Sequence, residues 1–157
     1  MRTLTLLVAL LLTLTACAAT PSPSPAASAH TQHDPQLERV KAALRDAFDM
    51  SFEPAGPHHE VGTAPDAVEL DLVGVPVEEV VLSVPRNEPE LGIRYLPHLR
   101  ELLRGPAPLW EWMEDGLTCR RDEPAVCQPE ISQGNLTARF TEGDRTYIVL
   151  VIARGQG

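Results

Sequence analysis

The sequence lacks the motifs on which most assignments of catalytic function rest. It contains no G-x-S-x-G nucleophile elbow, no H-E-x-x-H zinc motif and no glycine-rich loop that would cradle a phosphate. Its paired carboxylates, Glu78-Glu79 and Glu114-Asp115, are neighbours in sequence, and neighbouring side chains on a strand or helix diverge. Because no catalytic group can be nominated, we expect a protein that is not an enzyme and that uses no cofactor.

Positive charge and aromatic side chains are also scarce. Lysine and arginine together number 13 against 22 aspartate and glutamate residues, which gives a formal net charge of −9, and aromatic residues make up 4% of the chain. The acidic residues are spread along the sequence and do not form a tail. An acidic surface favours solubility and disfavours nucleic acid and anionic lipid as partners.

No hydrophobic run is long enough to span a membrane, but a shorter one lies near the N-terminus. Arg2 precedes the run at 4–14, whose eleven residues fall short of the roughly twenty that a helix needs to cross a bilayer. A positive start, an apolar run and small residues are typical of a secretory signal. The run ends in Leu14-Thr15-Ala16-Cys17, which resembles the bacterial lipobox at all four positions.

The resemblance implies a bacterial lipoprotein. A diacylglycerol would be joined to the sulfur of Cys17, cleavage would fall before Cys17, and two or three acyl chains would anchor the protein stably, since each buried methylene contributes about 0.8 kcal/mol. We expect a location in the cell envelope, outside the cytoplasm, and in the outer membrane of a cell with two membranes because Ala18 is not acidic. The alternative is an ordinary cleaved signal in which Cys17 is incidental.

The composition divides the chain into three parts. Residues 1–16 are the predicted signal peptide, and residues 17–33 hold the lipidated cysteine and a spacer rich in proline, serine and alanine that cannot bury a core. Loss of the signal leaves 141 of the 157 residues and, because Arg2 is lost, changes the net charge from −9 to −10. Residues 34–157 are long enough for one globular domain.

The domain is predicted to begin with a helix over 35–50. Asp34 is a good N-cap, Pro35 suits the first helical position, and apolar residues then recur at helical spacing as far as Met50. Between Glu53 and Asp66, prolines and glycines predict a long loop.

Two shorter helices are predicted in the middle of the chain. The first covers 96–104 and ends at Gly105, and the second covers 108–115 and ends at Gly116.

Four segments have the alternating pattern of strands: 68–73, 79–84, 136–140 and 145–153. The first two form a hairpin with a five-residue connection. The last is apolar on both faces, so we expect it in the middle of the sheet, paired with 136–140. Together with helices packed on at least one face, these strands predict an α+β domain with a small antiparallel sheet.

Cys119 and Cys127 remain once Cys17 is lipidated. An exported chain folds in an oxidising compartment, so the two are predicted to form a disulfide. A catalytic or redox pair would have C-x-x-C spacing, which is absent.

Aromatic residues supply one speculative binding site. Trp110 and Trp112, near Tyr95, could line a groove for a sugar, peptide or lipid. The alternative is that they belong to the core, which we favour for at least one of them.

Histidines supply a second speculative site. His58 and His59 lie beside Glu60 in the predicted loop, and His30 and His33 form an H-x-x-H pair in the spacer. Imidazole and carboxylate suit Zn²⁺ or Cu²⁺. The alternative is that all of them are solvated loop residues.

The sequence as a whole favours a membrane-anchored lipoprotein with a non-catalytic domain that binds a partner, which we expect to be another envelope protein. A carrier of a small ligand or a metal ion is the alternative. A small hydrolase stays open as the enzyme class, although no nucleophile and base can be named.

Overall fold

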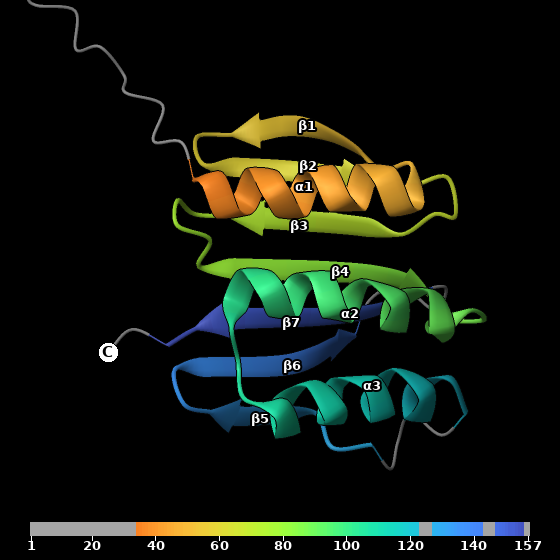
Figure 1. The fold of residues 1–157 in the computed structure, drawn as a ribbon. Helices are drawn as coiled ribbons and strands as arrows, with labels where there is room; N and C mark the ends of the chain where they lie inside the picture. Colours follow the sequence, from red (N-terminus) through yellow and green to blue (C-terminus); the bar gives the residue numbers. More distant parts are fainter. Residues whose placement is uncertain (1–33, 123–126, 143–146, 156–157) are drawn as a thin grey trace, which may run out of the picture. The chain divides into compact units, whose positions relative to one another are not determined.

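The computed structural model describes residues 34–122, 127–142 and 147–155. The predicted signal peptide, the lipobox with Cys17, and the spacer with His30 and His33 lie outside these residues. Three helices pack on one face of a seven-stranded sheet, and Figure 1 shows them side by side in front of it. The α+β class is confirmed, and the predicted number of strands is wrong because the sheet has seven and not four.

The helices are α1 (Pro35–Phe48), α2 (Pro89–Leu103) and α3 (Ala107–Asp122). The strands are β1 (Ser51–Gly56), β2 (His59–Thr63), β3 (Glu69–Val73), β4 (Glu79–Pro85), β5 (Glu130–Gln133), β6 (Leu136–Glu142) and β7 (Tyr147–Arg154). The strand order is β1-β2-β3-β4-β7-β6-β5, and every neighbouring pair is antiparallel.

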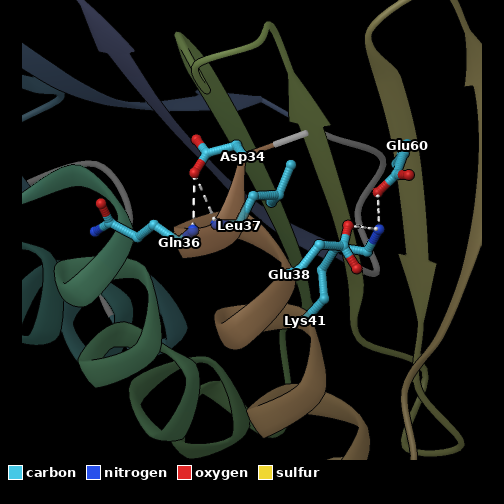
Figure 2. Close-up of polar contacts among 6 residues, drawn as sticks. All are labelled: Asp34, Gln36, Leu37, Glu38, Lys41 and Glu60. Carbon is cyan, nitrogen blue, oxygen red and sulfur yellow. Dashed lines mark hydrogen bonds and ion pairs between the residues drawn. The ribbon is translucent and has the colours of Figure 1, made fainter. Parts of the chain in front are cut away.

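Helix α1 agrees with its prediction to within two residues. The carboxylate of Asp34 accepts hydrogen bonds from the backbone N–H of Gln36, at 2.8 Å, and of Leu37, at 3.3 Å (Figure 2). These bonds satisfy donors that a helix N-terminus otherwise leaves free. Leu37, Val40 and Leu44 point from the helix into the core.

The long loop predicted between Glu53 and Asp66 is wrong, because this segment forms the hairpin β1–β2. Strand β1 lies at the edge of the sheet and is exposed along most of its length, so its sequence shows no apolar alternation. Pro54 is compatible with an edge, where one side of the strand has no ladder to join. The other edge strand, β5, was also missed, since Ile131 is its only apolar residue.

Both shorter helices extend beyond their predicted limits. Helix α2 begins at Pro89, a favoured first residue, and continues through Pro97. Helix α3 runs through Gly116 to Asp122. Gly116 faces the ring of Phe140 so closely that a Cβ there would lie 2.7 Å from Cζ. Glycine at this position therefore serves helix-to-sheet packing and does not end the helix.

The predicted central strand is confirmed. Strand β7 lies between β4 and β6, and the hairpin β3–β4 has the predicted five-residue connection, 74–78. Leu70, Leu82 and Leu150 are fully buried between the sheet and the helices. Among the described residues, no helix combines the length and apolar character needed to cross a membrane.

Candidate functional site

The face of the sheet opposite the helices, called the open face below, is covered by no element that the structure describes (Figure 1). Successive side chains of a strand point to opposite faces, so the neighbours of the helix-facing Leu70, Leu82 and Leu150 belong to the open face. Across the sheet, one row of this face reads Glu53, Val61, Asp71, Val81, Val151, Arg139 and Glu130.

An apolar strip runs along β4 and β7 in the middle of the open face. Val81 lies opposite Val151, Ser83 opposite Val149, and the pairs Glu79–Ala153 and Pro85–Tyr147 occupy the ends. Val81 and Val149 are half-buried, and only 7% of Val151 is exposed. Contiguous apolar surface of this kind, with a polar border, is characteristic of interaction sites.

Carboxylates dominate the charged side chains of the open face. The described residues contribute five, Glu53, Glu69, Asp71, Glu79 and Glu130, against one arginine, Arg139. The open face therefore combines an apolar centre with an acidic border.

His59 and Asp71 make a side-chain contact on this face. They lie on the adjacent strands β2 and β3, and Nε2 of His59 is 2.9 Å from Oδ1 of Asp71. His58, with a positive φ of 56°, is an exposed turn residue. Within the described part of the chain, no three histidine, cysteine, aspartate or glutamate side chains gather in a way that could hold a metal ion.

Lys41 links helix α1 to the hairpin β1–β2, whose two strands form one side of the open face. Its Nζ lies 2.6 Å from Oε2 of Glu60 on β2 and 2.9 Å from Oε1 of Glu38 (Figure 2). Burial by itself lowers the pKa of Lys41, but the hydrogen bonds and charges of Glu60 and Glu38 outweigh it, so the pKa is raised above 10.5.

Tyr95, proposed as a groove residue, is completely buried. Its ring stacks on Phe48 with centroids 4.1 Å apart, and its hydroxyl lies 3.5 Å from Oδ1 of Asp66. Burial, the charge of Asp66 and this hydrogen bond raise the pKa of Tyr95 far above 10.0.

The two tryptophans have different surroundings. Trp110 is buried, and its Nε1 donates to the carbonyl oxygen of Gly105 at 3.1 Å. Trp112 is half-buried, and its ring lies 5.2 Å from that of Phe140. The structure therefore places Tyr95 and Trp110 in the core and brings only Trp112 to the surface.

Trp112 lines a surface hollow of about 210 Å³ beside the disulfide. The other lining residues are Asp115, Gly116, Cys119, Cys127 and Gln128. The predicted disulfide between Cys119 and Cys127 is confirmed and forms one wall. Sites for drug-sized ligands usually measure about 300–1,000 Å³, so this hollow suits a smaller molecule.

Two arginines lie near the end of α3. Arg86 donates from Nη1 to the carbonyl oxygen of Arg120 at 3.5 Å, and Arg120 donates from Nη2 to the carbonyl oxygen of Gln128 at 3.0 Å. The Arg120 guanidinium also lies 4.2 Å from the Phe140 ring centroid. Burial and the like charge of Arg86 lower the pKa of Arg120.

Sequence reasoning missed the open face as a site, although one signal was present. The segment 147–153 is apolar on both faces. That pattern predicts a strand in the middle of the sheet, but it does not show that the helices cover only one of the two apolar faces. In comparisons with protein-family models, curated proteins and solved structures, nothing matches this chain.

Proposed function

We propose that this protein is a lipid-anchored component of the bacterial cell envelope whose α+β domain binds another envelope protein through the open face. The observation that carries the proposal is the apolar strip of Val81, Val149 and Val151 in the middle of a face that no described element covers. The lipobox resemblance at Leu14-Thr15-Ala16-Cys17 supports the anchor and the location.

The strip is better suited to a protein than to a small molecule. It follows two long strands, β4 and β7, which pair over seven positions, and lies on a sheet surface instead of in a cavity. Small ligands are usually bound in concave sites that bury most of their surface. A surface with an apolar centre and a polar border is the usual anatomy of a protein–protein interface.

Photocrosslinking in the native host tests this function. The full-length chain would carry benzoylphenylalanine in place of Val149, at the centre of the strip, or in place of Glu111, which is exposed on α3. We expect an adduct with an envelope protein from position 149 and not from position 111. A Cys17→Ser variant, which cannot be lipidated, should lose the adduct. Equal labelling from both positions, or none from 149, would contradict the proposal.

A small-ligand carrier is the second candidate, and the hollow beside Trp112 is the observation that favours it. Saturation-transfer NMR with a collection of single-ring compounds and monosaccharides tests it, with Trp112→Ala as the control. If the ligand of the carrier is a metal ion, the residues proposed to bind it are His58 and His59. Calorimetry with Zn²⁺ and Cu²⁺ tests this, and binding no tighter than about millimolar would count against it.

A further inference from the structure

We infer that the partner of the open face is a different protein whose contact surface has an apolar centre bordered by lysine or arginine side chains. This inference rests on the proposed function of the open face and specifies the chemistry of its partner. It follows from how the chain distributes its charges between the two faces of the sheet.

On the helix-covered face, a buried cation is matched by carboxylates. Lys41 is the only lysine in the sequence, and its side chain, 6% exposed, pairs with Glu38 and Glu60 where α1 packs on β2 (Figure 2). Where helix α1 covers the sheet, a carboxylate of the sheet, Glu60, therefore balances the charge of the lysine that is buried there.

On the open face, most carboxylates have no such partner. Asp71 contacts His59, whereas the ion pairs recorded among the described residues do not include Glu53, Glu69 or Glu79. Glu53 and Glu69 are exposed, and Glu79 is half-buried. A surface that covered them would leave three desolvated negative charges unless it brought cations, which is an expensive arrangement.

The register places two of these carboxylates, Glu69 and Glu79, beside the apolar strip, whereas Glu53 lies farther out on the edge strand β1. Glu69 lies opposite Ser83 of β4, whose other neighbour is Val149 of β7. Glu79 lies on β4 itself, opposite Ala153. Residues that contact the strip from the β3 side would therefore reach Glu69 and Glu79 as well. A complementary surface needs apolar groups over the valines and cations toward β1, β2 and β3.

A second copy of this chain does not fit that requirement. Face-to-face pairing would bring ten carboxylates of the described residues together with two copies of Arg139, and juxtaposed like charges oppose association. Pairing through the sheet edges is also hindered. Strand β1 has Pro54 and a bulge before Gly56, and β5 is four residues long.

Charge reversal combined with crosslinking tests the inference. In the full-length lipoprotein with benzoylphenylalanine at position 149, Glu53→Lys with Glu69→Lys should lower the yield of the adduct at least about tenfold, since rim charges steer association. The matched control is Glu111→Lys with Glu114→Lys, which makes the same change in net charge on exposed positions of α3. This control should keep the wild-type yield. Thermal unfolding of each variant confirms that it is folded.

The adduct also identifies the partner's side of the contact. Mass spectrometry should find a crosslinked peptide that contains lysine or arginine beside apolar residues. Reversal of those cations to glutamate in the partner should restore the adduct with the Glu53→Lys, Glu69→Lys variant.

Three outcomes overturn the inference. The first is an adduct whose yield changes equally in the Glu53→Lys, Glu69→Lys variant and in the control variant on α3. The second is an adduct that joins two copies of this chain. Both leave the open face as a binding surface. The third is the absence of any adduct from position 149, which rejects the proposed function as well.

Discussion

Nζ of Lys41 lies 2.6 Å from Oε2 of Glu60, and this contact joins helix α1 to strand β2 (Figure 2). Apolar contact between the hairpin β1–β2 and the core is limited, because β1 is largely exposed and only Gly62 of β2 is buried, with Phe52 packed partly against the core. A charged contact therefore adds to the packing of Phe52 in holding the hairpin β1–β2 against helix α1. Since this hairpin carries one border of the open face, its position bears on binding as well as on stability.

Replacement of Lys41 by methionine should lower the free energy of unfolding by about 1–3 kcal/mol. The substitution retains much of the buried stem but removes the charged hydrogen bond to Glu38 and the ion pair with Glu60, and charged contacts of this kind are worth about this much when partly buried. Urea denaturation measures the change. Arg39→Met, at an exposed position of the same helix, is the control and should change the stability by less than about 0.5 kcal/mol. A similar loss of stability in both variants would show that the contacts of Lys41 with Glu60 and Glu38 do not stabilise the domain.

Stability should fall above about pH 10. The pKa values of Lys41 and Tyr95 are both raised in the folded state, so each group keeps its proton there after the unfolded chain has lost it. Their contributions are complete below the unfolded pKa values, 10.5 and 10.0, and are lost as the pH rises toward the folded values. Each group can contribute a slope of up to about 1.4 kcal/mol per pH unit.

Urea denaturation at several alkaline pH values measures this slope. Tyr95→Phe should make the decline shallower because it removes one of the two groups. Tyr147→Phe, at a half-buried position of the open face, controls for the loss of a tyrosine. A decline that is identical in the Tyr95→Phe variant and the wild type would contradict the prediction.

Gly116→Ala should destabilise the domain, although alanine is ordinarily better than glycine inside a helix by about 1 kcal/mol. The new Cβ would lie 2.7 Å from Cζ of Phe140, so the ring or the helix must shift, and overpacking of this kind costs about 1–3 kcal/mol. Thermal denaturation measures the effect. In a Phe140→Leu background the same substitution should be neutral or stabilising, and a failure to see this reversal would reject the steric explanation.

Removal of the disulfide should lower the free energy of unfolding by about 2.5 kcal/mol, the chain-entropy value for a loop of nine residues. Denaturation of the Cys119→Ser, Cys127→Ser variant measures this. Dithiothreitol should destabilise the wild type by a similar amount and leave the double variant unchanged. Because Cys119 and Cys127 line the hollow beside Trp112, the same variant should weaken any ligand bound there.

The sequence predicted those elements whose local pattern and burial agree. Asp34 and Pro35 marked the start of α1, and the alternation in 79–84 and 136–140 marked β4 and β6. Prediction from the sequence failed where the tertiary structure overrode the local pattern. Gly116 has the composition of a helix end but is retained inside α3 by its contact with Phe140, and Pro54 has the composition of a loop but lies in an edge strand.

The sequence predicts β4 and β7, the strands that form the centre of the candidate site, but not how their side chains are arranged on it. The sequence by itself determined the α+β class, the central place of β7 and the disulfide, because hydrophobic period and cysteine number are local or compositional properties. Only the tertiary structure decided that Tyr95 and Trp110 are core residues, that all three helices lie on one face, and that Val81, Val149 and Val151 form a strip with carboxylates beside it. The reason is that strand order and register bring together residues from distant segments, and no local pattern records which face of a strand is left uncovered.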